Sequence, residues 1–220
     1  MHRLTGLYGI TDSQIQPDDK TLMETVELAL IGGMKVLQYR DKSTDSARRA
    51  RQAGALKALC HQHQALLIIN DDIELAVEVE ADGVHLGQED DSVIKARKRL
   101  GDYAIIGISA ENSIAQAKEA AEQGVNYLAF GRFFPSLTKP EAKPANIALL
   151  TEAKARFDLP IVAIGGITVD NASDIIAAGA DMVAVINNLF TASDIQYRAR
   201  EFNQLFAPLT EKSNILSPVS

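Results

Sequence analysis

The sequence is poor in cysteine, in basic residues and in long apolar runs, and each shortage excludes a class of protein. A single cysteine, Cys60, excludes an internal disulfide framework and fits a reducing compartment, so we expect a cytoplasmic protein. The 22 Lys and Arg residues are outnumbered by 29 Asp and Glu residues, and the net charge of −7 argues against binding to nucleic acid or to an anionic membrane. An anionic substrate would therefore need a local cluster of cations or a metal ion.

Membrane-spanning and nucleotide-binding signatures are missing as well. No run approaches the roughly 18 to 20 apolar residues of a membrane span, and the polar pair Thr11-Asp12 comes before an apolar segment of signal-peptide length can form. The first predicted strand is followed by no G-x-G-x-x-G motif, and the chain has no P-loop. We therefore expect a soluble, unprocessed chain that binds neither membranes nor nucleic acids.

Short apolar runs rich in Val, Ile and Leu alternate with longer segments that have helical spacing. The runs predict eight strands at Leu7–Thr11, Val36–Tyr39, Leu66–Ile69, Gly83–Leu86, Ala104–Ser109, Tyr127–Phe130, Ile161–Ile164 and Met182–Ile186. The longer segments predict eight helices at Lys20–Ile31, Ser46–His61, Ile73–Val79, Ser92–Leu100, Ile114–Gln123, Asn146–Phe157, Ala172–Ala177 and Asp194–Phe206. The strands are continuous apolar runs, as expected for parallel strands covered on both faces.

Eight strand–helix units predict an α/β protein with the architecture of a (β/α)₈ TIM barrel. With 220 residues, 46% of them hydrophobic, the chain suits one domain, which we place at residues 1–209. A polar tail at residues 210–220 is expected to fray. An open doubly wound sheet is the structural alternative. In a barrel the chemistry gathers where strands end and helices begin, so these junctions are the places to search.

Polar residues stand at the end of the second predicted strand and directly after it. In the segment Gln38-Tyr39-Arg40-Asp41-Lys42, the alternation of an extended chain places Gln38, Arg40 and Lys42 on one side. Two cations and an amide would then face one direction, as an anion site requires. A solvated strand end is the alternative interpretation.

Pairs of aspartates follow the third and fourth predicted strands. The second member of each pair, Asp72 or Asp91, stands where a helix N-cap is wanted. The first members, Asp71 and Asp90, would follow adjacent strands, and two carboxylates completed by phosphate oxygens and water are the usual way to hold Mg²⁺. Capping or pairing with lysine is the alternative for these two. His85 lies inside the fourth strand, where a histidine is more often a structural, hydrogen-bonded residue than a base or ligand.

Groups suited to phosphate follow the later strands. The longest loop contains Ser136, Thr138 and Lys139, which can donate hydrogen bonds to a phosphoryl group and neutralise it, so this loop could act as a lid. A solvated loop is the alternative. Gly165-Gly166 follows the seventh strand and Asn187-Asn188 the eighth, where barrels often bind phosphate through backbone N–H groups.

Seven segments, running from the first predicted strand to the seventh, occur in the order found in one known family. They are Tyr8-Gly9-Ile10-Thr11-Asp12, Gly32-Gly33 with Gln38-Tyr39-Arg40-Asp41-Lys42, Ile69-Asn70-Asp71, the segment from Asp82 to Asp90, Gly107-Ile108-Ser109, Pro135-Ser136-Leu137-Thr138-Lys139 and Ala163-Ile164-Gly165-Gly166-Ile167. On these motifs, which cover most of the chain, the sequence resembles the thiamine-phosphate synthase family.

The resemblance implies an enzyme that joins the diphosphate of a hydroxymethylpyrimidine to a thiazole phosphate, with release of pyrophosphate and help from Mg²⁺. By the matching motifs, the resemblance assigns one group of residues to the pyrimidine diphosphate: Gln38, Tyr39, Arg40, Asp41, Lys42, Asn70, Ser109 and Lys139. The thiazole phosphate would be bound by Ser136, Leu137, Thr138, Gly166, Ile186 and Asn187. The metal would be held by Asp71 and Asp90, and the catalytic groups would be Arg40, Lys42, Ser109 and Lys139.

Three positions depart from the family pattern. Arg132 replaces a proline of the long loop, and Ser136 replaces a threonine while keeping its hydroxyl. The eighth strand of the family usually ends in Ile-Ser, where this chain has Ile186-Asn187. The departure at Asn187 bears directly on the site implied for the thiazole phosphate.

The residue chemistry agrees with this reaction. Breaking a carbon–oxygen bond to pyrophosphate builds negative charge, which Mg²⁺ with Arg40, Lys42 and Lys139 would stabilise. We expect a dissociative substitution that depends on positioning and charge stabilisation, since no nucleophile is needed and none of the usual triads can be read from the motifs. Thiazole tautomerases share this barrel but need neither the paired aspartates nor the cations. A non-catalytic phosphate-binding barrel is the third hypothesis.

Overall fold

A computed structural model describes residues 4–87, 92–135 and 144–206, and these residues form a closed barrel of eight parallel strands. The strands are β1 (Gly6–Ile10), β2 (Val36–Tyr39), β3 (Leu66–Asn70), β4 (Gly83–Leu86), β5 (Ile105–Glu111), β6 (Tyr127–Phe130), β7 (Ile161–Ile164) and β8 (Met182–Val185). They follow one another in chain order, and β1 closes the barrel by pairing with β8. The predicted (β/α)₈ barrel is confirmed, and the open sheet is excluded.

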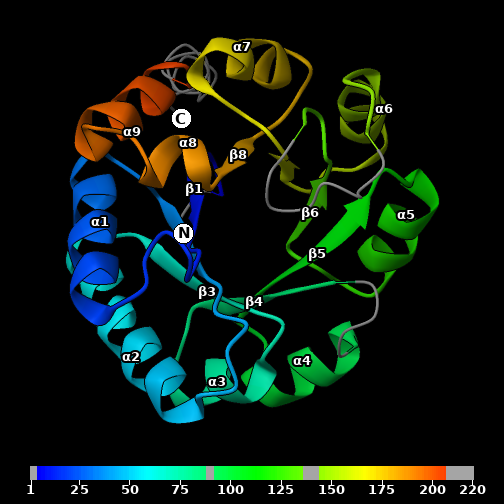
Figure 1. Cartoon of the computed structure of the whole chain (residues 1–220). Helices are drawn as coiled ribbons and strands as arrows, with labels where there is room; N and C mark the ends of the chain where they lie inside the picture. The colour runs from blue at the N-terminus through cyan, green and yellow to red at the C-terminus, as the bar shows by residue number, and fades with distance from the viewer. Residues whose placement is uncertain (1–3, 88–91, 136–143, 207–220) are drawn as a thin grey trace, which may run out of the picture.

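Helices surround the strands in a ring that also follows the chain order (Figure 1). Within the described residues they are α1 (Asp19–Ile31), α2 (Ser46–Gln62), α3 (Ile73–Glu78), α4 (Val93–Leu100), α5 (Ile114–Glu122), α6 (Ala148–Arg156), α7 (Val169–Ala177), α8 (Asn187–Phe190) and α9 (Ile195–Gln204). Eight of them match the predicted helices. The short α8 was not predicted, because a four-residue helix is too short to show a periodic pattern. None of the helices in the described part of the chain is long and apolar enough to cross a membrane.

Side-chain caps fix where most of these helices begin. An oxygen of the capping side chain accepts a backbone N–H three residues later at Asp18, Asp45, Asp72, Ser92, Ser113 and Asp194. Asp72 is thus the N-cap of α3, as predicted. The N-cap of α4 is Ser92, so the prediction that Asp91 caps this helix is wrong, and Asp91 itself lies outside the described residues. A capping box between Thr168 and Asn171 starts α7 at Val169, three residues before its predicted start.

The apolar side chains form two cores. The larger core lies between the strands and the helices, and Leu7, Leu37 and Leu67 point into it. The smaller core fills the inside of the barrel, where Tyr8 and Tyr127 are its largest members. Alternation along each strand therefore separates residues that hold the helices from residues that lie under the barrel mouth.

The amino ends of β4, β6 and β8 are held by one recurring contact, which we call the strand-start clamp. A side-chain oxygen of the residue just before the strand accepts an N–H from the preceding strand, and a basic side chain of an outer helix donates to the same residue. The three clamps are Asp82 with Leu67 and Lys57, Asn126 with Ile106 and Arg97, and Asp181 with Ile161 and Lys154. These contacts lie at the end of the barrel opposite the polar junctions.

Candidate active site

Most of the predicted site residues stand where β2, β3, β5, β7 and β8 end, at one end of the barrel. Those within the described residues are Gln38, Tyr39, Arg40, Asp41, Lys42, Asn70, Asp71, Ser109, Gly166, Ile186 and Asn187. The others, together with the tail at 210–220, lie outside the described residues: Asp90, Ser136, Leu137, Thr138 and Lys139.

At the end of β2, Gln38 points to one side, and Tyr39 and Asp41 contact residues of α2. The side chain of Gln38 points into the barrel, where its Nε2 donates to the hydroxyl of Tyr8 at 2.7 Å. Tyr39 points the other way and donates to Oε1 of Gln52 on α2, also at 2.7 Å. The pKa of the Tyr39 hydroxyl is raised, first by burial and then by the negative charge of Asp41, so this group stays a donor at physiological pH. The structure therefore brings Gln38, but not Tyr39, to the inner side.

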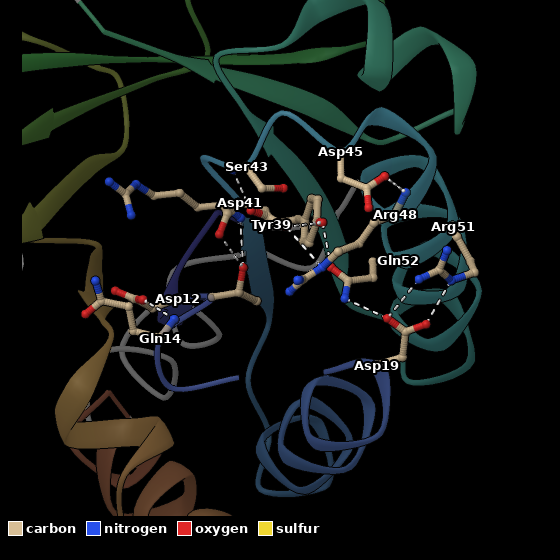
Figure 2. Close-up of polar contacts among 12 residues, drawn as sticks. Asp12, Gln14, Asp19, Tyr39, Asp41, Ser43, Asp45, Arg48, Arg51 and Gln52 are labelled. Carbon is tan, nitrogen blue, oxygen red and sulfur yellow. Dashed lines mark hydrogen bonds and ion pairs between the residues drawn. The ribbon is translucent and has the colours of Figure 1, made fainter. Parts of the chain in front are cut away.

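Asp41 anchors the segment from the outer side (Figure 2). Its side chain is 2% exposed, its Oδ1 accepts the N–H of Ser43 at 2.8 Å, and its Oδ2 lies 3.5 Å from Nε of Arg48. The neighbouring Gln52 continues this contact, since its Nε2 donates to Asp19 at the start of α1 at 2.7 Å. The end of β2 is thus tied to both α1 and α2.

Arg40 and Lys42 are the cations of this segment. The backbone of Arg40 is held by Thr11 at the end of β1: its N–H donates to the Thr11 hydroxyl at 2.8 Å, and that hydroxyl donates back to its carbonyl at 3.3 Å. Among the described residues, the Arg40 guanidinium makes no hydrogen bond or ion pair. Lys42 reaches across to β3, where its Nζ lies 2.6 Å from Oδ2 of Asp71. Thr11 was not predicted to matter, although it stands in the first motif.

Asp71 stands in a turn directly after β3. Its φ of +63° lies in the left-handed region, which aspartate tolerates better than most residues. Its N–H continues the ladder by donating to the carbonyl of His85 at 2.8 Å, and its Oδ2 accepts from both Lys42 and the amide of Asn70, at 2.6 Å each. The turn therefore directs the carboxylate toward the cation and amide that precede it.

This donor set suits a hard cation. A carboxylate oxygen beside an amide is the kind of ligand that Mg²⁺ takes, and the described residues offer no group of three or more His, Cys, Asp or Glu that would favour a zinc site. The second predicted ligand, Asp90, lies outside the described residues. The neighbouring Asp72 is committed elsewhere, because it caps α3 and pairs with Arg49 at 2.7 Å.

Gly166 is the best defined of the residues predicted to bind the thiazole phosphate. Its φ of +62° suits glycine, and an added Cβ would come within 2.3 Å of the carbonyl oxygen of Pro135. The segment that ends at Pro135 runs along the end of β7, since Phe134 donates its N–H to the carbonyl of Gly165 at 3.0 Å. The residues that follow Pro135 in the chain are Ser136 to Lys139. Ile186 is the N-cap residue of α8, which begins at Asn187 shortly after β8, the strand that lies between β7 and β1.

His85 and Ser109 meet at the bottom of this mouth. Nε2 of His85 lies 3.0 Å from Oγ of Ser109, and Nδ1 lies 2.9 Å from the hydroxyl of Tyr127. The histidine is buried and stacks on the ring of Tyr127, with the ring centres 5.5 Å apart. The expected hydrogen-bonded environment of His85 is therefore present. Tyr8 and Tyr127 were not singled out, although a tyrosine within an apolar strand is a signal of a buried polar contact.

Comparisons with known proteins agree on one family. Residues 7–189 match the family described as thiamine monophosphate synthase. The chain is 53% identical over 203 residues to a thiamine-phosphate synthase of Nitrosococcus oceani, covering 92% of this chain and 93% of that protein. It is equally 53% identical, over 204 residues, to a thiamine-phosphate synthase of Marinobacter nauticus, covering 92% of this chain and 91% of that one.

Solved structures give the same result. The thiamine phosphate pyrophosphorylase of Pyrococcus furiosus superposes with a TM-score of 0.83 at 30% identity, covering 98% of this chain and 99% of that one. A 3-hexulose-6-phosphate synthase with a TM-score of 0.64 is only 15% identical, so that likeness shows the barrel fold alone. The matched sequence and the matched barrel together place this chain in the thiamine monophosphate synthase family.

Proposed function

We propose that this protein is a thiamine-phosphate synthase: it joins hydroxymethylpyrimidine diphosphate to thiazole phosphate, forming thiamine phosphate and releasing pyrophosphate. The observation that carries the proposal is the meeting of Lys42, Asn70 and Asp71 beside Arg40 at one end of the barrel, in a chain of this family. A thiazole tautomerase would need no such cluster of charges. The substrates are small phosphorylated molecules, and the single cysteine fits a cytoplasmic enzyme.

In the proposed reaction, the pyrimidine methylene carbon loses its bond to the diphosphate and gains a bond to the thiazole. The carbon–oxygen bond between the pyrimidine methylene and the diphosphate breaks, and its electron pair leaves with the pyrophosphate oxygen. The thiazole nitrogen then supplies the pair for the new carbon–nitrogen bond. In this dissociative order no protein nucleophile is required, and the protein acts by holding the two substrates in line and by stabilising charge.

Arg40 and Lys42 are proposed to receive the leaving diphosphate. The Thr11 hydroxyl fixes the Arg40 backbone on both sides, so the guanidinium starts from a rigid point. Tyr39 and Asp41 face α2, and for them we propose a positioning role: they hold the segment so that the residues between and after them face the substrate. Gln38, Asn70, Ser109 and Lys139 complete the proposed pyrimidine site.

Asp71 and Asp90 are proposed to hold Mg²⁺. When bound, the ion would supply positive charge to the leaving pyrophosphate. The contribution of Asp71 rests on its turn, which places its carboxylate within reach of Lys42 and Asn70. Lys42 thereby stands between the proposed metal ligand and the proposed diphosphate site, where it can contact both.

The thiazole phosphate is proposed to lie at the ends of β7 and β8, against Gly166, Ile186 and Asn187. The N–H of Gly166 makes no hydrogen bond among the described residues, and a glycine allows a phosphate to approach the backbone closely. The proposed partners Ser136, Leu137 and Thr138 follow Pro135, which lies beside Gly166. An amide at Asn187 can donate to phosphate as the family serine would.

The test is an assay with both phosphorylated substrates and Mg²⁺. We expect thiamine phosphate and pyrophosphate in equal amounts from the purified protein. Lys42→Met should reduce the rate strongly, while Lys20→Met, which removes an exposed lysine of α1, should not change it. The absence of both products from the unaltered protein would contradict the proposed function.

A further inference from the structure

A chain of hydrogen bonds crosses the inside of the barrel from Gln38 to Ser109. The amide of Gln38 contacts the hydroxyl of Tyr8 at 2.7 Å, and that hydroxyl lies 2.9 Å from the hydroxyl of Tyr127. Tyr127 contacts Nδ1 of His85 at 2.9 Å, and Nε2 of His85 contacts Ser109 at 3.0 Å. Five residues from β2, β1, β6, β4 and β5 are joined in this way.

The number of donor protons on each group determines which partner donates in every hydrogen bond of this chain. Nε2 of Gln38 can only donate, so Tyr8 accepts from it. The proton of Tyr8 then has one acceptor among the described residues, the Tyr127 hydroxyl, and Tyr127 donates onward to Nδ1 of His85. A neutral imidazole that accepts at Nδ1 carries its proton on Nε2, so His85 donates to Oγ of Ser109. Each of the two tyrosine hydroxyls therefore accepts once and donates once within the chain.

Packing holds the chain in this arrangement. Tyr8 and Tyr127 are at most 1% exposed, and their rings meet edge to face with centres 6.1 Å apart. Burial raises the pKa of Tyr8 to about 12 and that of Tyr127 well above its usual value, so both hydroxyls keep their protons. Gly107 on β5 makes room for the Tyr127 ring, because a Cβ there would come within 1.9 Å of it. A broken link would leave a buried polar group unsatisfied, which costs about 1–3 kcal/mol.

We propose that Tyr8 and Tyr127 are positioning residues that fix His85 as the Nε2–H tautomer and thereby set the polarity of the two ends of the chain. Ser109 accepts from His85 and directs its own proton to another acceptor, and Gln38 presents Oε1 as an acceptor. An anionic substrate is bound by hydrogen-bond donors. Because His85 donates to Ser109 in this arrangement, the Ser109 hydroxyl does not donate its own proton to His85. The tautomer is a property of the protein alone; only its use on the pyrimidine diphosphate rests on the proposed function.

Nitrogen-15 NMR of histidine-labelled protein tests the tautomer without any assay of activity. The chain has four histidines, so the His85 signals are assigned by their loss in His85→Asn. In mildly alkaline solution, where histidine is neutral, we expect a protonated Nε2 and an unprotonated Nδ1. A proton on Nδ1 would mean that the chain runs in the opposite direction, with the Gln38 amide turned over, and would overturn the proposal. Signals averaged between the two tautomers would overturn it as well.

Three tyrosine-to-phenylalanine variants separate this role from general packing. Tyr127→Phe removes the donor to Nδ1 and should give averaged tautomers. Tyr8→Phe leaves Tyr127 with His85 as its only acceptor in the chain, so the Nε2–H tautomer should persist. Tyr39→Phe, a buried tyrosine that bonds to Gln52 instead, should leave the His85 signals unchanged. His85 signals that do not change in Tyr127→Phe would contradict the proposal.

Kinetics supply the second measurement. In Tyr127→Phe we expect kcat/KM for the pyrimidine diphosphate to fall roughly tenfold, as for the loss of one oriented hydrogen bond, with the KM for thiazole phosphate unchanged. A protein with the expected tautomer but no synthase activity would disprove the proposed function alone. An active enzyme with the wrong tautomer would disprove this inference alone. If Tyr127→Phe does not fold, the unaltered protein and Tyr8→Phe still decide the tautomer.

Discussion

The two adjacent aspartates after β3 make different contacts, and their backbone conformations account for the difference. Asp72 is extended and caps α3, whereas Asp71 adopts a left-handed conformation that directs its carboxylate toward Lys42. The sequence predicts this division, because a cap must stand directly before the helix. Pairing with a lysine is the alternative interpretation of Asp71, and the structure shows this pair; the sequence does not identify Lys42 as that lysine, or Arg49 as the partner of Asp72, since these residues lie 29 and 23 positions away.

Replacing Asp71 by asparagine tests the metal site. Asparagine also tolerates the left-handed conformation, so Asp71→Asn should fold normally. Turnover at limiting Mg²⁺ should fall about 10² to 10³-fold, the usual loss for a preorganised electrostatic contact. The matched control is Asp72→Asn, in which the new side chain still caps and the lost pair with Arg49 costs less than about 1 kcal/mol. Equal turnover in the two variants would remove Asp71 from the metal site.

Two glycines should respond to alanine in opposite directions. At Gly107 the added Cβ would overlap the Tyr127 ring, so Gly107→Ala should destabilise the protein by about 1–3 kcal/mol. Gly54 lies within α2 with nothing within 4 Å of a Cβ, so Gly54→Ala should stabilise it by about 0.5–1 kcal/mol. Urea unfolding midpoints measure both changes. A neutral Gly107→Ala would show that the barrel interior can shift to accept the methyl group.

At the scale of elements, the strand-start clamps and the polar junctions lie at opposite ends of the barrel. One end fixes the strands and the other carries the candidate chemistry, as is usual in this architecture. The clamp at β6 uses Asn126, which shows that the contact to the preceding strand needs no negative charge. The charges of Asp82 and Asp181 add ion pairs with Lys57 and Lys154, and Asp82 has a further contact with His61.

Asp82 makes part of the stability depend on pH. Burial alone would raise the pKa of this carboxyl, but hydrogen bonds from Lys57, the Leu67 N–H and His61 hold it below its usual value. Because the folded pKa is lower than the unfolded pKa, the stabilisation is fully present above the unfolded value, near 4, and is lost as the pH falls through the folded value.

The variant Asp82→Asn should remove this dependence. At neutral pH it should cost about 1.5–3 kcal/mol, the range for a hydrogen bond to a charged group. Below pH 4, approximately, its unfolding free energy should fall less steeply than that of the unaltered protein. Urea titrations across this range measure the two slopes. Parallel slopes would show that Asp82 is not among the groups that bind protons on acid unfolding.

Element positions follow well from the sequence, while their ends depend on contacts that it does not show. All eight strands coincide with predicted apolar runs because burial on both faces leaves a continuous signal. Helix α6 begins at Ala148, two residues after its predicted start, because the Asn146 side chain binds the Ala148 N–H instead of joining the helix. The β5 strand extends to Glu111, two residues beyond its predicted end, through an irregular register with β6. The pattern of apolar residues does not predict this irregularity.

At the scale of the whole molecule, the candidate site is assembled from residues far apart in sequence. The two tyrosines of the internal chain are 119 positions apart, and His85 and Tyr127 are 42 apart. Single motifs predict which residues carry chemistry, because the barrel brings all strand ends to one place. They do not predict which side chains bond to one another, because this depends on the register and on the room left by glycines such as Gly107.

The single cysteine should report on unfolding of the whole barrel. Cys60 lies on the buried face of α2 and is fully buried, and this burial, followed by the charge of Asp82, raises the pKa of its thiol to about 12. A thiol reagent at pH 8 should therefore leave the folded protein unmodified and should react at once in concentrated urea. The modification rate in intermediate urea should follow global unfolding measured by circular dichroism. Rapid uptake of one equivalent by the folded protein would contradict this prediction.

The pairing of β1 with β8 also limits how copies of this chain could associate. Every strand of the barrel has a neighbour on each side, so the sheet offers no edge to which a strand of another molecule could be added. The large apolar side chains exposed in the described residues lie outside the sheet, on α1, α4, α9 and the turn after α4: Leu28, Ile31, Ile94, Tyr103 and Tyr197. Any assembly built from the described surface must therefore join helices and loops, without extending the sheet from one copy to the next.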